Sequence, residues 1–146
     1  MTSETAKPKR HGNNAPTTVA DIAAHKDTIA AFGYTVSRDG VHTLAERHGI
    51  DHIATEDWTP IAAHVAAIGA ESLSGEHVRV VIGDAQVVWY VRDGRFAVVA
   101  VLVAGSPFTK SVLRMCRRAL KTMAAAVVVE TTREAFAASV AAVGAR

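Results

Sequence analysis

Three apolar runs with strand character follow one another in the second half of the chain, separated by tight turns. Gly83-Asp84 and Asp93-Gly94 lie between the runs. Pairs of this kind favour β-hairpins because both residues tolerate a positive φ. The pattern therefore predicts an antiparallel meander with strands over residues 77–82, 86–91 and 96–103. The last run is apolar at nearly every position, which is typical of a central strand covered on both faces.

The pattern of the first half predicts a helix followed by a hairpin. Apolar residues recur near helical spacing from Val19 to Phe32, so we expect a helix there, capped by Thr17 or Thr18 and ended by Gly33. Two short apolar runs, 34–37 and 41–44, flank Arg38-Asp39-Gly40 and predict a second hairpin. We expect a loop from residue 48 to residue 56.

A middle helix is predicted from Pro60 to Ser72. Asp57 or Thr59 would cap it, and Pro60 would lie in its first turn, where a missing N–H costs little. Most of its other positions are alanine, which favours close helix packing. One face of this helix is lined by Ile61, Val65 and Ile68.

The last part of the chain predicts a third helix and a short extra one. Ser106 would cap the third helix, with Pro107 in its first turn and its end near residue 125. Thr131 and Glu134 have capping-box spacing and precede further apolar residues at helical spacing. We therefore expect a short C-terminal helix docked on the core, with residues 127–129 as a connector or an additional strand.

This order of elements predicts an α/β layered domain with a five-stranded antiparallel sheet and helices on both faces. Residues 1–16 are polar, contain two prolines and lack apolar periodicity, so we expect a disordered basic tail. Residues 17–125 would form the layered domain, and residues 126–146 the helical extension.

The composition supports a single soluble domain. The chain has 146 residues, of which 49% are hydrophobic, which is enough for a core. Its longest apolar stretch, residues 96–104, is far shorter than the roughly 18 to 20 residues that cross a bilayer, and no hydrophobic signal core begins the chain. We therefore expect a cytoplasmic protein. Cys116 is the one cysteine, which excludes an intrachain disulfide and suggests a buried, reduced thiol.

Charge is segregated along the chain although its formal net value is only +2. Residues 17–105 carry six Lys or Arg and eleven Asp or Glu, whereas residues 106–129 carry five Lys or Arg and no acid. Four of these cations follow i, i+4, i+7, i+11 spacing and would form one helical stripe: Lys110, Arg114, Arg117 and Lys121. The stripe is either a solvated face or a site for an acidic protein surface, for the chain's own acidic part or for phosphate groups. Nucleic acid fits least, since no aromatic residues are interleaved.

Motifs of catalytic or metal chemistry are weak. His48, Asp51 and His52 would approach a metal-ligand cluster if their loop were helical, but a polar loop fits them better because a third ordered ligand is missing. His64 fits a packed or interfacial histidine better than a base. Residues 105–111 have the wrong glycine-to-lysine spacing for a phosphate loop. We therefore predict no catalytic residue, no metal and no cofactor, and expect that the protein is not an enzyme.

The element order, the Arg38-Asp39-Gly40 hairpin, the alanine-rich helix from Pro60 to Ser72 and the meander ending in a long helix resemble the roadblock/LC7 domain, whose fold is profilin-like. The resemblance covers about residues 18–123 and implies a small adaptor that forms homo- or heterodimers. Members of the family regulate Ras-like small GTPases or scaffold motor and signalling complexes. The basic tail and the C-terminal extension depart from the minimal family pattern.

The resemblance also implies a dimer interface, in which the third strand pairs with its copy and the middle helices pack together. The strand would contribute Val78, Val80 and Ile82, and the helix Ile61, Val65 and Ile68. An exposed valine-rich edge strand independently calls for a cover, because it is an aggregation hazard. The alternative is that the helix residues face this chain's own sheet.

The leading hypothesis is thus a non-enzymatic dimeric adaptor, with itself or a paralogue, that regulates a small Ras-like GTPase or scaffolds a signalling complex. One alternative is a ligand-binding sensory domain, which requires a roomy pocket with convergent polar groups. Another is a structural complex subunit without GTPase contact, docked through its C-terminal helix.

Overall fold

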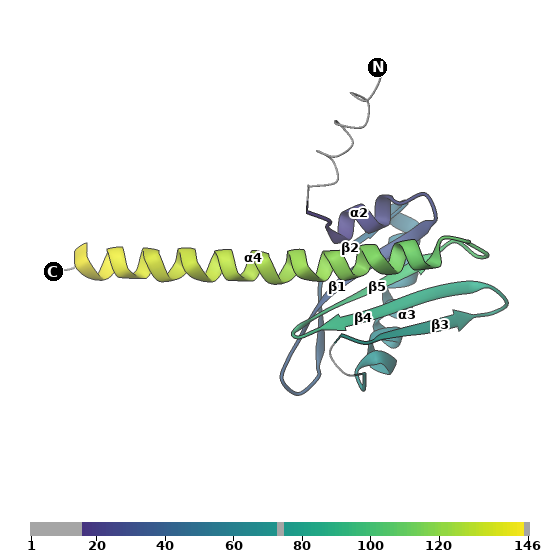
Figure 1. Ribbon diagram of the computed structural model, residues 1–146, viewed down its shortest axis with the longest axis horizontal. Helices are drawn as coiled ribbons and strands as arrows, with labels where there is room; N and C mark the ends of the chain where they lie inside the picture. Colours follow the sequence, from purple (N-terminus) through teal and green to yellow (C-terminus); the bar gives the residue numbers. More distant parts are fainter. Residues whose placement is uncertain (1–15, 73–74, 145–146) are drawn as a thin grey trace, which may run out of the picture.

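The computed structural model describes residues 16–72 and 75–144 and contains a five-stranded antiparallel sheet (Figure 1). Its strand order is β2-β1-β5-β4-β3, and the five-stranded antiparallel sheet agrees with the predicted layered fold. The strands are β1 (Thr28–Val36), β2 (His42–Gly49), β3 (His77–Ile82), β4 (Gln86–Asp93) and β5 (Phe96–Leu102). The three strands of the meander thus agree with the sequence pattern to within two residues. The predicted basic tail lies outside the described residues, apart from Pro16.

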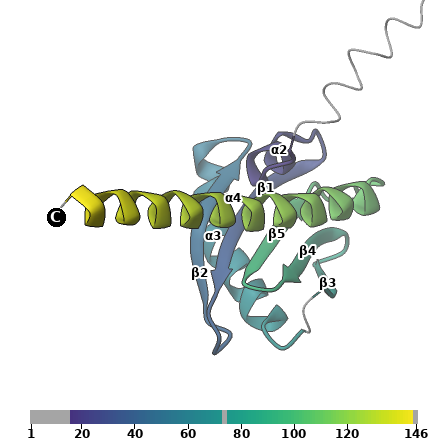
Figure 2. The same cartoon turned by 60° about the vertical axis from the view of Figure 1, so that its left-hand side comes forward.

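Helices cover both faces of the sheet, as predicted (Figures 1 and 2). Helix α3 (His52–Gly69) packs on one face, and α2 (Val19–Ala24) and α4 (Thr109–Gly144) pack on the other. The central strand β5 serves both layers because its side chains alternate between the faces. Ala97, Val99 and Val101 enter the core under α3, whereas Val98, Ala100 and Leu102 enter the core under α2 and α4.

The first helix is shorter than the sequence pattern predicts, and the prediction of a helix up to Gly33 is wrong. Thr18 does cap α2, in a capping box with Asp21, but the helix ends at Ala24 and β1 begins at Thr28. Gly33 lies inside β1, where a Cβ would come 3.1–3.3 Å from neighbouring side chains. Its role is therefore close packing within the strand rather than helix termination.

Helix α3 begins eight residues before Pro60, so the predicted loop and cap are also wrong. Asp51 is the cap, and its carboxylate accepts a hydrogen bond from the Ala54 N–H at 2.7 Å. Pro60 lies inside the helix, which continues to Gly69. A proline removes one backbone hydrogen bond there.

Helix α4 runs without a break to Gly144, so the separate short helix and its connector are not formed. No glycine or proline interrupts residues 109–143, and the capping-box spacing of Thr131 and Glu134 occurs within the helix. The helix starts at Thr109, three residues after the predicted cap Ser106. Its C-terminal part continues beyond the sheet rather than docking on it (Figures 1 and 2).

Candidate interaction surface

The two edges of the sheet differ in how they are protected. β2, at one edge, carries the charged Glu46 and Arg47, and its pairing with β1 is irregular next to Gly33. Charges and bulges are the usual devices that keep an edge strand from pairing with another chain. β3, at the other edge, pairs with β4 in continuous register and has the sequence His-Val-Arg-Val-Val-Ile. β3 has one charged residue, Arg79, and no irregularity in its pairing, so of the two edges it is the one better suited to pairing.

The predicted edge residues of β3 divide between the core and the surface. Val78 and Val80 are half-buried and pack against the core under α3. Ile82 is 37% exposed, and its neighbour Val81, which the sequence analysis did not select, is 45% exposed. The end of this strand therefore offers apolar side chains as well as unpaired backbone groups.

Helix α3 contributes a second apolar strip. Ile61 and Ile68 are 38% and 51% exposed, whereas Val65 is 2% exposed and packs against the chain's own sheet. Val65 therefore belongs to the core and leaves the outward face to Ile61 and Ile68. We call these two residues together with Ile82 the β3–α3 surface; the side chain of Val81 points to the opposite face of the sheet, like that of its partner Val87.

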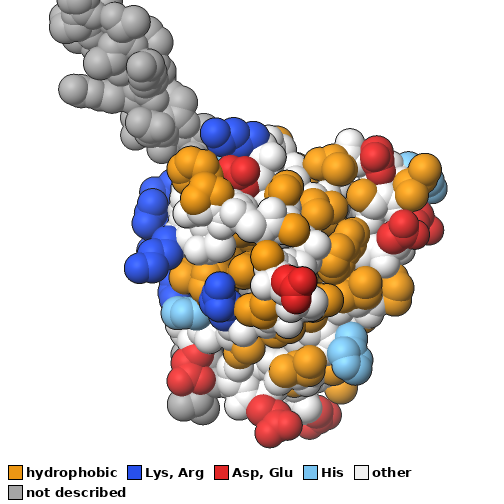
Figure 3. Space-filling model, turned by 90° about the vertical axis from the view of Figure 1, so that its right-hand side faces the viewer, with side chains coloured by type: hydrophobic (Ala, Val, Ile, Leu, Met, Phe, Trp, Pro, Cys, Tyr) orange, Lys and Arg blue, Asp and Glu red, His pale blue; other side chains and the backbone are white. Residues whose placement is uncertain are grey.

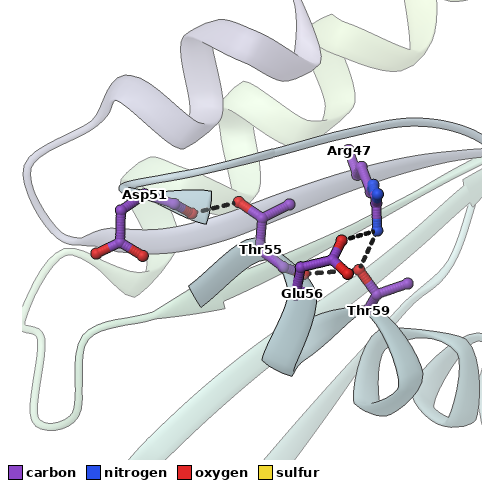
Figure 4. Close-up of polar contacts among 5 residues, drawn as sticks. All are labelled: Arg47, Asp51, Thr55, Glu56 and Thr59. Carbon is purple, nitrogen blue, oxygen red and sulfur yellow. Dashed lines mark hydrogen bonds and ion pairs between the residues drawn. The ribbon is translucent and has the colours of Figure 1, made fainter. Parts of the chain in front are cut away.

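Polar contacts fix α3 on the sheet at its N-terminal half (Figure 4). The Arg47 guanidinium on β2 lies 2.6 Å from the Glu56 carboxylate and donates a hydrogen bond of 3.4 Å to the Thr59 hydroxyl. At the other end of the helix, Gly69 packs directly on the Tyr90 ring, and a Cβ at this position would overlap the ring atoms. Both ends of α3 are thus attached, which presents its outward face on a rigid support.

A buried polar link was missed by the sequence analysis. His42 Nε2 lies 2.7 Å from the Tyr90 hydroxyl, and His42 Nδ1 lies 3.0 Å from the Gly40 carbonyl oxygen. Burial lowers the pKa of His42, and burial raises the pKa of the neighbouring Tyr34 to about 12. The residues of the link are far apart in sequence and carry no motif. The arrangement joins β2 to β4.

The predicted basic stripe on α4 is shifted by one residue. Lys110, Arg114 and Lys121 are exposed as expected. Arg117 is half-buried and donates a hydrogen bond of 3.2 Å to the Gly75 carbonyl, with His77 Nδ1 at 2.7 Å. Its place on the exposed side is taken by Arg118. We call Lys110, Arg114, Arg118 and Lys121 the α4 cation row.

Two surface pockets are small. One of about 230 Å³ lies between α4 and the end of β4 and is lined by Arg92, Arg117 and Lys121 among others. The other, of about 280 Å³, includes Thr35, Arg95 and Phe96. Both are below the roughly 300 to 1,000 Å³ of typical small-molecule sites. Neither of these two pockets is large enough to enclose a typical ligand.

The remaining candidates for chemistry have structural surroundings. His48 Nε2 lies 2.9 Å from the Glu46 carboxylate, and Asp51 caps α3. In the described part of the chain, no group of three His, Cys, Asp or Glu is placed to hold a metal ion. His64 is exposed on α3. Cys116 is fully buried, and burial raises its pKa to about 12, so its thiolate is strongly disfavoured.

No helix within the described residues combines the length and apolar character that a bilayer crossing requires. Comparisons with protein-family models and with curated proteins find no match for this chain. The surfaces described above are therefore the features from which a function can be inferred.

Proposed function

We propose that the protein is a non-enzymatic dimeric adaptor that assembles through the β3–α3 surface. The observation that carries this proposal is the edge strand β3, which carries one charged residue, Arg79, pairs with β4 without the irregularity of β2 and ends in the exposed Val81 and Ile82. An uncovered edge of this kind is a template for pairing with another chain. A second copy or a paralogue is the partner that completes it.

The geometry of such a dimer follows from the antiparallel sheet. Two β3 strands that pair antiparallel are related by a two-fold axis perpendicular to the sheet, so the sheet continues from one copy into the other. Both copies of α3 then lie on the same face and approach each other near the axis. Ile68, near the end of α3 that packs on β4, would be buried there together with Ile82.

The adaptor would act on a signalling partner, for which the resemblance to roadblock/LC7 domains suggests a small Ras-like GTPase or a complex that it scaffolds. We expect the adaptor itself not to act on the nucleotide. Regulation would therefore consist of binding one conformation of the GTPase more tightly and shifting its population. Stimulated hydrolysis would use the catalytic groups of the GTPase, ordered by the contact.

Light-scattering mass of the purified protein tests the dimer. The expected mass is twice the 15.4 kDa of the chain. The double variant Val81→Glu/Ile82→Glu should be monomeric, because it places charged side chains on both faces of the pairing edge. The matched control Val41→Glu/Leu44→Glu changes two exposed apolar residues near the opposite edge and should remain dimeric.

Circular dichroism must show that both variants are folded. A monomeric wild type, or equal dissociation of both variants, would contradict assembly through β3. Regulation is tested separately by adding the protein to purified small GTPases of the same organism and following nucleotide hydrolysis and exchange. We expect a change in one of these rates with the wild type and a smaller change with the β3 variant.

A further inference from the structure

The α4 cation row places four exposed positive charges on one side of a helix. Its four members occupy about three turns of one helix, and residues 106–129 contain no acid. Helix neighbours at i+3 and i+4 usually include opposite charges that pair. None of the four makes an ion pair with another described residue; the described ion pairs involve His25, Arg47 and His48 instead. The row therefore keeps its charge available to something outside the domain.

Apolar side chains lie next to the beginning of this row. Phe108 is 43% exposed directly before α4, and the ammonium group of Lys26 lies 4.9 Å from the centre of its ring. Val103 is also exposed in the segment that leads to the helix. Figure 3 looks onto this end of the molecule: hydrophobic side chains gather near its middle, and Lys and Arg lie mostly along one border. Cations and an exposed aromatic ring thus occur side by side.

We propose that the side of the protein formed by α4 docks on an anionic membrane surface. A helix of 36 residues is about 54 Å long, and it lies along the outside of the domain, so a flat surface reaches the whole cation row at once. Lys and Arg are attracted to anionic headgroups, and a phenylalanine ring inserts at the boundary of headgroups and acyl chains. This combination fits a lipid surface better than nucleic acid, because no aromatic residues are interleaved along the row.

The distribution of acids would orient the protein on the membrane. Glu56, Asp57 and Glu71 lie on or just beyond α3, which covers the opposite face of the sheet. The α4 side also carries the acids Asp21 and Glu46, but its cation row outweighs them, so an anionic surface attracts this face and repels that of α3. In the proposed dimer the two-fold axis is perpendicular to the sheet, so both cation rows face the same side. The presence of two cation rows on one side rests on the proposed dimer, whereas docking of a single copy on the membrane does not.

Co-sedimentation with vesicles tests the proposal. The wild type should bind vesicles of phosphatidylserine mixed with phosphatidylcholine, and should not bind phosphatidylcholine alone. The variant Lys110→Glu/Arg114→Glu should lower the partition coefficient roughly tenfold or more. The control Arg38→Glu/Arg95→Glu makes the same change in net charge on two turns at the other end of the sheet and should change binding far less. Phe108→Ser should weaken binding with the cation row intact.

Several outcomes would overturn the proposal. One is failure of the wild type to bind phosphatidylserine vesicles at low salt. Another is an equal loss of vesicle binding in Lys110→Glu/Arg114→Glu and in the control Arg38→Glu/Arg95→Glu. Binding that survives 1 M salt would also do so, since the screening length is then only about 3 Å. The Val81→Glu/Ile82→Glu protein should still bind, more weakly than the wild type. Its binding separates failure of the dimer from failure of the membrane contact.

Discussion

With a neutral His42, the His42–Tyr90 link has one consistent arrangement of protons. A carbonyl oxygen only accepts hydrogen bonds, so His42 Nδ1 carries the proton that it donates to Gly40. His42 Nε2 then accepts the hydrogen bond of the Tyr90 hydroxyl. Burial lowers the pKa of His42; the Gly40 contact opposes this effect, and the nearby Arg92 charge adds to it. The fold therefore favours the neutral imidazole.

Because the folded chain favours neutral His42, we expect this residue to lower the stability of the fold at acid pH. The pKa of His42 is lower in the folded chain than its ordinary value of 6.5, so its contribution to stability is present above pH 6.5 and is lost as the pH falls through the folded pKa. His42→Gln keeps a hydrogen-bonding side chain that does not titrate. The free energy of unfolding, measured by urea titration, should fall less between neutral and acid pH in this variant than in the wild type.

The control for this effect is His64→Gln, which changes an exposed histidine on α3. Its acid dependence should stay close to that of the wild type. A His42→Gln protein that loses as much stability on acidification as the wild type would show that other groups govern the effect.

At the level of elements, the observed start of α3 gives Asp51 and Asp57 different roles. Asp51 caps the helix and accepts the Ala54 N–H, whereas Asp57 lies exposed in the second turn. Asp51→Ala should lower the free energy of unfolding by about 1 kcal/mol, which is typical for loss of a cap. Asp57→Ala should change it by less than about 0.5 kcal/mol, as other exposed sites do. Urea unfolding of both variants measures the difference, and a larger loss at Asp57 would contradict the observed start of α3.

The strands were predictable because their signals are local. Asp93-Gly94 sits at a hairpin turn with Gly94 at a φ of 60°, which few other residues adopt. The helices were harder to place. Ile29 and Phe32 fit a helical spacing, but both lie in β1, where the sheet decides their conformation. Pro60 suggested the first turn of a helix, but α3 begins before Pro60 and continues past it. The hydroxyls of Thr55 and Thr59 each donate a hydrogen bond to the backbone carbonyl four residues earlier (Figure 4).

The surfaces were predictable only in part, for a geometric reason. Arg117 and Arg118 are adjacent, so the helix period places both near the border of the exposed side, and only the docking of α4 on the sheet selects Arg118. Ile61, Val65 and Ile68 share a spacing, but packing buries Val65 alone. The His42–Tyr90 contact joins residues 48 positions apart and has no sequence signal.

For the whole molecule, one sheet supports two cores. Alternate residues of β5 enter opposite layers, so loss of either layer removes half of the side-chain contacts of the same strand. The chain also carries a tryptophan on each side: Trp58 packs beside the core under α3, and Trp89 lies in the core under α4, where its indole N–H donates to the Thr109 carbonyl at 2.7 Å. Each layer thus has its own natural fluorescent reporter.

The shared strand predicts that both layers unfold together. In Trp58→Phe the fluorescence reports the α4 side, and in Trp89→Phe it reports the α3 side. Urea titrations of each variant, followed by fluorescence and by circular dichroism, should give the same midpoint with both signals. Trp89→Phe loses the bond to Thr109, so its common midpoint should be lower. A fluorescence midpoint in Trp58→Phe below its circular dichroism midpoint would mean that the α4 layer separates first, and that the two cores are not coupled through β5.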